Sequence, residues 1–294
     1  MSLGGLLIID KPAGMTSHDV VAKLRKVCKT KRVGHGGTLD PMATGLLIIG
    51  VEAGTKALQY ISAASKTYDA TICLGISTHT DDAEGDEISR ADVSAVTDDQ
   101  IRNGLSAMVG EIEQIPSSVS AIKVDGQRAY DLVRAGETVE LKSRAVTIFA
   151  IDVHSIERRE GLIFVEVSVE CSSGTYIRAI ARDLGAALAV GGHLTALRRT
   201  HSSGFTLADS HQWDEPGLTP TPLREALRAF MGEIVVDASL TPKIFNGLNL
   251  EWTWPQTDRP VMVIESGTDR LLAIGQEVAG KLTYHSVFNQ ALAD

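Results

Sequence analysis

Cysteine and paired metal ligands are scarce in this sequence. Of its 294 residues only Cys28, Cys73 and Cys171 are cysteines, and no two of them form a CxxC pair. Eight histidines are scattered along the chain without an HExxH pattern. The sequence therefore predicts neither a disulfide framework nor a zinc site, and we expect no metal and three reduced, packed thiols.

Long apolar segments are also missing. No stretch of membrane-spanning length is free of charge, and the first apolar run reaches Asp10 and Lys11 before it could form the core of a signal peptide. We expect a cytoplasmic protein with no membrane association. Hydrophobic residues at 44% and charged residues at 22% are typical of a globular chain, here one large domain with or without a small companion.

An overall positive charge is absent as well. The net charge of −9 argues against a polyanionic partner, but the charge is unevenly spread. Residues 1–60 contain eight basic and four acidic side chains, a net charge of +4, whereas residues 81–113 contain ten acidic and two basic ones. Two interpretations of residues 19–32 stay open: a basic face that binds a polyanion, or a solvated helix of mixed charge.

Strand and helix patterns mix along the chain without a regular βαβ repeat. Apolar runs at 6–9 and 46–51 predict buried strands, and residues 97–109 have the spacing of a surface helix. Another helix, capped by Thr16 or Ser17, has an inner face that consists of Val20, Val21, Leu24 and Val27. We predict an α+β fold around a mixed or largely antiparallel sheet.

The motif GHGGTLDPMATG, residues 34–45, places Asp40 among turn-forming residues. Glycines at 34, 36, 37 and 45 let the backbone approach a ligand closely, and Pro41 stiffens the position after the acid. With an ordinary pKa of about 3.9, Asp40 is an anion at neutral pH. It then suits the roles of nucleophile, base, metal ligand or simple turn residue, and the motif alone does not choose among them.

Three further residues are candidates for a site around Asp40. His35 lies in the glycine-rich loop, where an imidazole can stack on or replace a base, and Tyr68 in SKTYDA is an amphipathic ring on a predicted strand. Arg178 in GTYIRAI lies in the first turns of a predicted helix, where a cation gains nothing from the helix dipole. We therefore expect a specific anionic partner for Arg178, although each residue alone also fits a structural role.

Six segments follow one another through most of the chain: DKPAGMTSHDVV, GHGGTLDPMATGLL, KTYDA, PSSVSAIKVDGQRAYDLVRAGE, CSSGTYIRAIARDLG and HLTALRRTHSSGF. In this order they resemble the TruB family, the bacterial tRNA pseudouridine-55 synthases. Several motifs in the right order make the match specific, whereas GTLDPMATG alone is only moderately specific because other pseudouridine synthase families carry a related motif.

The resemblance implies a reaction as well as a fold. The T-loop uridine of tRNA would become pseudouridine without cofactor or metal, by cleavage of the C1'–N1 bond, rotation of the uracil and rejoining through C5. Asp40 would be the essential carboxylate, acting as a nucleophile or in removing a ribose proton. A single carboxylate is enough because the uracil is retained, whereas a sugar hydrolase needs two.

The resemblance also implies roles for the other candidates. Tyr68 would stack on the uracil and serve in the final removal of the C5 proton, and Arg178 would pair with Asp40 and favour its anionic form. His35 would fill the space left by the flipped nucleotide. Tyr176 and Leu197 would line the pocket. Lys11, in the Lys-Pro turn, would support the fold near the site.

RNA binding is expected from an insertion and a second domain. The insertion at 117–143 would close over the T-loop, with phosphate contacts from Lys123, Arg128 and Arg134. By resemblance, residues 1–232 form the catalytic domain and residues 233–294 a small β domain of the PUA type. We expect a monomer that binds the T-stem-loop of tRNA and needs no protein partner.

Three other functions compete with this interpretation. A non-catalytic RNA-binding protein on the same fold would be expected to lose Asp40, Tyr68 or Arg178, yet all three are present. A glycoside hydrolase would need a second carboxylate close to Asp40. A synthase acting on ribosomal RNA fits GTLDPMATG and the insertion poorly. The acidic residues 81–87 are predicted to form a solvated turn, with a supporting role at the site as the alternative.

Overall fold

The computed structural model of the chain describes residues 4–117, 141–257, 259–268 and 270–288, together with the backbone of 123–124 and 127–128. These residues form one ten-stranded sheet, one five-stranded sheet and two short strand pairs. The pairs are β5 (Ile76–Thr78) with β6 (Glu87–Arg90), and β8 (Lys123–Val124) with β9 (Gln127–Arg128).

The larger sheet has the strand order β14-β1-β3-β12-β4-β11-β10-β7, with β13 beside β12 and β2 beside β3. Its strands are β1 (Gly4–Lys11), β2 (Val33–Gly36), β3 (Thr44–Glu52), β4 (Lys66–Leu74), β7 (Gly110–Gln114), β10 (Arg144–Arg159), β11 (Leu162–Cys171), β12 (Gly192–Ser202), β13 (Phe205–Thr206) and β14 (Thr221–Pro222). Strands β12 and β3 run parallel and the other neighbours antiparallel. The mixed sheet that the sequence predicted is confirmed.

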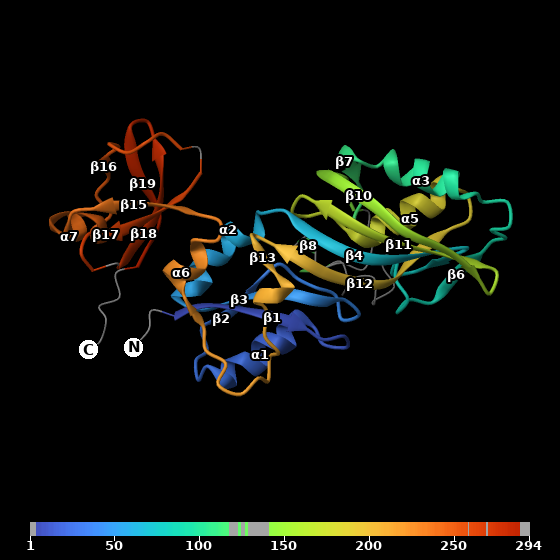
Figure 1. The fold of residues 1–294 in the computed structure, drawn as a ribbon, viewed down its shortest axis with the longest axis horizontal. Coiled ribbons are helices and arrows are strands. Elements are labelled where there is room, and N and C mark those ends of the chain that lie inside the picture. Colours follow the sequence, from blue (N-terminus) through green and yellow to red (C-terminus); the bar gives the residue numbers. More distant parts are fainter. Residues whose placement is uncertain are drawn as a thin grey trace.

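The smaller sheet, in orange and red in Figure 1, has the order β15-β17-β18-β19-β16. Its strands are β15 (Gly232–Val236), β16 (Leu250–Glu251), β17 (Val261–Glu265), β18 (Leu271–Val278) and β19 (Lys281–Val287). This β-rich end of the chain, together with the larger sheet and its helices, confirms the α+β class. The division into domains at residue 232 stays a prediction.

Helices cover both faces of the larger sheet. They are α1 (Ser17–Val27), α3 (Asp98–Ser106) and α5 (Ile177–Ala187) on one face, and α2 (Leu58–Ser62) and α6 (Leu223–Leu227) with the short 3-10 turns η1 (Ala53–Ala57) and η2 (Leu207–Asp209) on the other. The helix α7 (Thr241–Phe245) and the 3-10 turn η3 (Ala238–Leu240) pack against the smaller sheet instead. None of the helices in the described part of the chain is long and apolar enough to cross a bilayer.

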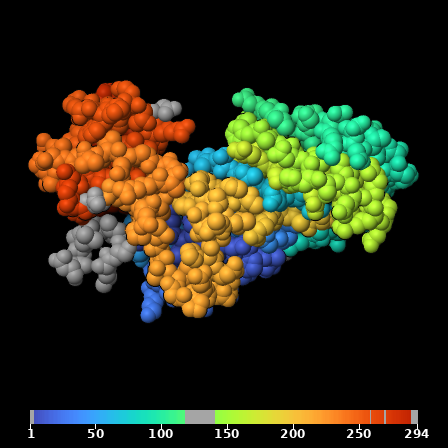
Figure 2. Space-filling model, viewed as in Figure 1, coloured from blue at the N-terminus to red at the C-terminus, as the bar shows by residue number. Residues whose placement is uncertain are grey.

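Strands β1 and β3 read as continuous apolar runs because both of their faces are buried. On one face, Leu7 and Ile9 join a core with α1, α3 and α5. On the other face, Leu6 and Ile8 join a second core with α2, α6 and the smaller sheet. That second core holds the two sheets together, and Figure 2 shows an open depression between the smaller sheet and the far end of the larger one.

Helix α1 is capped by Thr16, one of the two predicted caps, through a capping box with Asp19. The Thr16 side chain accepts from the Asp19 amide, and the Asp19 carboxylate accepts from the Thr16 amide. The predicted inner face is buried except at Val27, which is 41% exposed because the helix ends there. Helix α1 thus fixes the chain on its way to the segment that carries Asp40.

Gly45 allows the Asp40 segment to pass against β12. Its φ of +96° lies in the region that favours glycine, and a Cβ at this position would stand 2.3 Å from the carbonyl oxygen of Arg199. Gly45 and Arg199 are also partners in the parallel pairing of β3 with β12. The end of the loop is therefore fixed by backbone contact.

Replacing Gly45 by alanine should lower the free energy of unfolding by about 2 to 3 kcal/mol, because backbone strain and a clash with backbone add together. Urea titration followed by circular dichroism measures the loss. The matched control is Gly14→Ala, since Gly14 has a φ of +79° but nothing within 4 Å of the added Cβ. We expect about 1 kcal/mol for the control, and equal losses would show that the contact with β12 is unimportant.

Candidate active site

A cavity of about 260 Å³ opens beside the segment that carries Asp40. Five of the seven predicted site residues line it, namely Asp40, Tyr68, Tyr176, Arg178 and Leu197. They come from the loop between β2 and β3, from β4, from the start of α5 and from β12. His35 and Lys11 are not among the residues that line the cavity.

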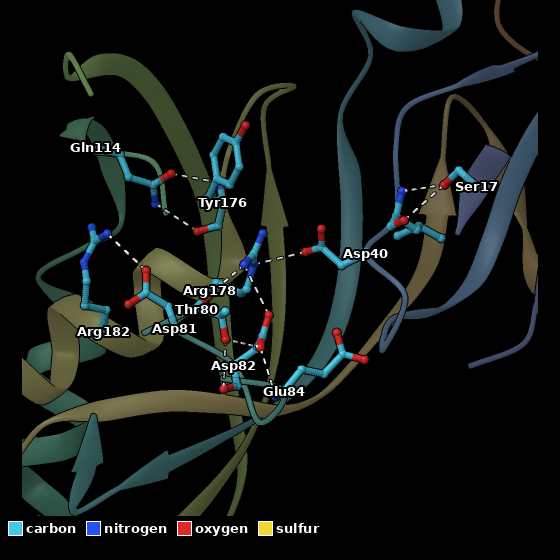
Figure 3. A network of polar contacts seen from close by, with 11 residues as sticks. Ser17, Asp40, Thr80, Asp81, Asp82, Glu84, Gln114, Tyr176, Arg178 and Arg182 are labelled. Atoms are coloured by element: carbon cyan, nitrogen blue, oxygen red, sulfur yellow. Dashed lines mark hydrogen bonds and ion pairs between the residues drawn. The ribbon is translucent and has the colours of Figure 1, made fainter. Parts of the chain in front are cut away.

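Arg178 joins two carboxylates at one side of the cavity. Its Nε lies 3.0 Å from Oδ2 of Asp40, and its Nη1 lies 3.2 Å from Oδ2 of Asp82 and 2.7 Å from the carbonyl oxygen of Thr80. Figure 3 shows the guanidinium between the two acids. The Arg178 side chain is only 5% exposed, so solvent screens these contacts little. The expected anionic partner of Arg178 is thus Asp40, with a second partner that the motifs did not identify.

The prediction of a solvated acidic turn at 81–87 is wrong at its first two residues. Asp81 and Asp82 are both buried, and Asp82 also accepts from the Thr80 hydroxyl and, at 3.1 Å, from the Glu84 amide. Asp81 lies 3.3 Å from Nη1 of Arg182. The turn packs against α5, and the two arginines that receive these acids are four residues apart on one face of that helix. That spacing is the sequence signal that would have identified the contact.

Burial decides the protonation equilibrium of Asp40. The pKa of this carboxyl is raised above its usual value, first because burial disfavours the anion and then because the Asp82 carboxylate is near. The Arg178 guanidinium and, more weakly, the Lys11 ammonium act in the opposite direction. Arg178 does favour the anion as expected, but the net direction is upward because burial outweighs it.

Asp82 does not form a hydrolytic pair with Asp40. It does not line the cavity, and its oxygens already accept hydrogen bonds from Arg178, Thr80 and the Glu84 amide. A glycoside hydrolase needs a second carboxyl that reaches the scissile bond. The arrangement instead makes Asp82 the group that orients Arg178, which in turn orients Asp40.

Tyr68, Tyr176 and Leu197 provide the apolar walls of the cavity. Tyr68 on β4 and Leu197 on β12 are buried. Tyr176 precedes α5, and its backbone amide and carbonyl pair with the Gln114 side chain at 2.8 and 3.1 Å, as Figure 3 shows. Burial raises the pKa of Tyr68, so its hydroxyl is protonated at neutral pH.

Lys11 contacts the backbone of the segment that carries Asp40. Its fully buried ammonium donates to the carbonyl oxygens of Pro12 at 2.9 Å, Met15 at 2.6 Å and Pro41 at 3.3 Å. Burial lowers the pKa of Lys11 to about 8, which leaves it mainly charged at pH 7. Lys11 thus contacts Pro41, the residue after Asp40, and its supporting role stays a prediction.

His35 stands on β2, beside the loop. Its ring meets His18 of α1 edge to face, with ring centres 5.1 Å apart. Burial and the neighbouring His18 and Arg199 lower the pKa of His35 to about 4, so the ring is neutral at pH 7. A neutral, flat ring suits the expected stacking role, which stays a prediction.

No metal site was expected, and the basic side chains of the insertion were expected to contact phosphates. In the part of the chain that the structure describes, no group of three or more His, Cys, Asp or Glu side chains could hold a metal ion. The side chains of Lys123, Arg128 and Arg134 lie outside the described residues.

The Asp82→Asn variant should lower the pKa of Asp40, because it removes a negative neighbour that disfavours the Asp40 anion. NMR titration of protein labelled with [γ-13C]aspartate, assigned with Asp40→Asn, measures the midpoint. The unaltered protein should titrate above 3.8 at Asp40. Asp81→Asn is the control, since Asp81 pairs with Arg182 instead, and a midpoint that is the same in all three proteins would contradict this electrostatic account.

Comparison with known proteins agrees with this geometry. The model of the TruB family pseudouridylate synthase N-terminal domain matches residues 25–177, and that of the tRNA pseudouridylate synthase B C-terminal domain matches residues 178–215. The five predicted site residues that line the cavity all lie within these two matches.

Individual relatives agree with the family models. The chain is 58% identical to tRNA pseudouridine synthase B of Corynebacterium efficiens over 206 residues, 70% of this chain and 69% of that protein. It is 47% identical to the protein of the same name from Leifsonia xyli subsp. xyli over 272 residues, 90% of each.

Solved structures share the fold of the whole chain. One of them, the crystal structure of a Cbf5-Nop10-Gar1 complex, superposes with a TM-score of 0.71 and 26% identity, covering 98% of this chain and 85% of that one. Together with the family models and the relatives, this likeness confirms the predicted resemblance. The chain belongs to the TruB family of pseudouridylate synthases, which are isomerases.

Proposed function

We propose that this enzyme converts the T-loop uridine at position 55 of tRNA into pseudouridine. The observation that carries the proposal is one carboxylate, Asp40, held by the buried Arg178 at the wall of a cavity that also contains Tyr68. The name of its curated relatives, tRNA pseudouridine synthase B, supports tRNA as the substrate class.

The reaction is an isomerisation within one nucleotide. The C1'–N1 bond breaks, the uracil turns within the cavity, and a bond forms between C1' and C5. The C5 proton then leaves and N1 gains one, so that no cofactor or metal is needed for the balance. A uridine in a folded RNA loop reaches such a site only when it is flipped out of its stack.

Asp40 acts at the ribose in this scheme. As a nucleophile it attacks C1', and as a base it removes a ribose proton, and both roles need the anion directed at the sugar. The contact with Arg178 fixes that direction, while Asp82 and Thr80 fix Arg178. Because Arg178 and Asp82 are buried and hold each other, the carboxylate does not have to be reoriented during the reaction.

The apolar walls hold the base. Tyr68 stacks on the uracil and receives the C5 proton in the last step, while Tyr176 and Leu197 limit its rotation. His35, neutral at pH 7, fills the gap that the flipped nucleotide leaves in the RNA stack. Lys11 keeps the loop at Pro41 in place.

The rest of the chain binds the RNA. Residues 1–232 form the catalytic domain and residues 233–294 a PUA-type domain, and the insertion at 117–143 closes over the T-stem-loop. The enzyme acts as a monomer without an obligatory protein partner.

Asp40→Asn should abolish the reaction. With tRNA transcript tritiated at uridine C5, the variant should release tritium at least about 10³-fold more slowly than the unaltered enzyme at matched tRNA binding. The control is Asp69→Asn. Asp69 follows Tyr68 in the chain, and its exposed carboxylate accepts a hydrogen bond from the Ser168 hydroxyl at 2.6 Å. Binding without any tritium release by the unaltered protein would support an RNA-binding protein without catalysis instead.

Neutralising the insertion should weaken tRNA binding. If Lys123, Arg128 and Arg134 contact phosphates, changing all three to glutamine should reduce the slope of log affinity against log salt by about 0.7 to 0.9 for each lost contact. Filter binding at several salt concentrations measures the slope. Unchanged affinity and slope would remove the insertion from the RNA interface.

A further inference from the structure

Arg199 is a buried cation that the motifs around Asp40 do not explain. It lies on β12 and is only 1% exposed, which places it among the largest fully buried side chains. Among the described residues, no carboxylate lies within ion-pair distance of its guanidinium. Burying an unpaired cation is unfavourable, so its contacts need a specific explanation.

Two hydrogen bonds of Arg199 go to the two ends of the Asp40 segment. Nε donates to the carbonyl oxygen of Leu46 at 2.6 Å, and Nη2 donates to that of Gly37 at 3.1 Å. One acceptor precedes Asp40 in the chain and the other follows it. A single rigid guanidinium therefore closes the loop that presents the carboxylate.

The same guanidinium also faces Tyr68. The two residues are partners in the pairing of β12 with β4, and the guanidinium carbon lies 6.0 Å from the centre of the Tyr68 ring. A hydrogen bond and the positive charge of Arg199 both oppose the rise that burial causes in the pKa of Tyr68. Arg199 thus contacts both the Asp40 segment and the aromatic wall, and it lines the cavity between them.

The two other buried cations near the cavity do not link the Asp40 segment to Tyr68. Lys66, two residues before Tyr68 on β4, is also buried, but its ammonium donates to the carbonyl oxygens of Ser62 and Ala64 at 3.1 and 2.9 Å. Arg178 is engaged with Asp40 and Asp82 on the other side of the loop. Arg199 is therefore the cation that links the loop to Tyr68.

We propose that Arg199 is a positioning residue that sets the placement of Asp40 relative to the Tyr68 hydroxyl and stabilises the Tyr68 phenolate during the final proton transfer. The second part rests on the role proposed for Tyr68. The Tyr68 hydroxyl is protonated at rest, so this step proceeds from the phenolate, which forms when the hydroxyl releases its proton to solvent. The C5–H bond breaks and its electron pair forms the C5–C6 double bond, while the electron pair of the C6–N1 double bond moves to N1, which takes a proton from solvent. The C5 proton passes to the Tyr68 oxygen.

Two variants and one neighbour test the proposal. Arg199→Met keeps the length of the side chain but removes its charge and donors, and Arg199→Lys keeps the charge while losing the planar pair of donors. Arg198→Met is the matched control, because the adjacent arginine instead binds Asp10 at 2.7 Å and is 39% exposed. Filter binding gives tRNA affinity, and single-turnover assays from pH 6 to 9 use transcripts with protium or deuterium at uridine C5.

We expect Arg199→Met to bind tRNA within about twofold of the unaltered enzyme and to form pseudouridine about 10²-fold more slowly, the effect typical of a misplaced reacting group. The deuterium isotope effect should rise, because removal of the C5 proton becomes slower relative to the earlier steps. Arg199→Lys should recover part of the rate with a smaller isotope effect, and Arg198→Met should match the unaltered enzyme.

If Arg199→Met forms pseudouridine more slowly but keeps the isotope effect and the pH profile, Arg199 only stabilises the fold and the proposal is overturned. An unchanged rate would overturn it as well. If Arg199→Met does not fold, Arg199→Lys is used in its place. The proposal then expects a raised isotope effect in Arg199→Lys, and a double variant with Tyr68→Phe whose loss of rate differs from the sum of the two single losses. Additive effects would count against the link to Tyr68. Failure of the proposed function is seen separately, because the unaltered enzyme would then form no pseudouridine in tRNA.

Discussion

The site depends on one buried guanidinium shared by two acids. Arg178 is held by Asp82 and by the Thr80 carbonyl, and it presents its remaining edge to Asp40. A buried cation with a single acid would leave donors unpaired, whereas two acids and a carbonyl satisfy it in one orientation. The pKa of Asp40 is raised first by burial and then by repulsion from Asp82.

The larger sheet turns this local contact into a rigid site. Strand β12 lies between β3, which follows the Asp40 segment, and β4, which carries Tyr68. Neighbouring strands have fixed spacing and register, so the sheet sets the distance between the Asp40 carboxylate and the Tyr68 ring. Helix α5 adds Arg178 and the turn before it adds Tyr176, whose backbone is tied to Gln114.

The sequence predicts the parts of this protein that follow local rules. The apolar runs of β1 and β3, the cap at Thr16 and the loop at Asp40 each depend on neighbouring residues, and all were predictable. The burial of Asp82 was missed because a count of charges along 81–113 does not show how the turn packs against α5, although the four-residue spacing of Arg178 and Arg182 would have indicated that contact. The exposure of Val27 was missed because helical spacing does not show where a helix ends.

The second core, between the larger sheet and the C-terminal sheet, makes the two parts mechanically dependent. Ile8 and Leu227 share this core with Met262, Ile274 and Phe288. A chain cut before β15 would leave a broad apolar face of the larger sheet in water. The C-terminal sheet therefore shares part of its core with the larger sheet, and its removal is expected to destabilise β1 and β3, whose side chains on that face form the second core.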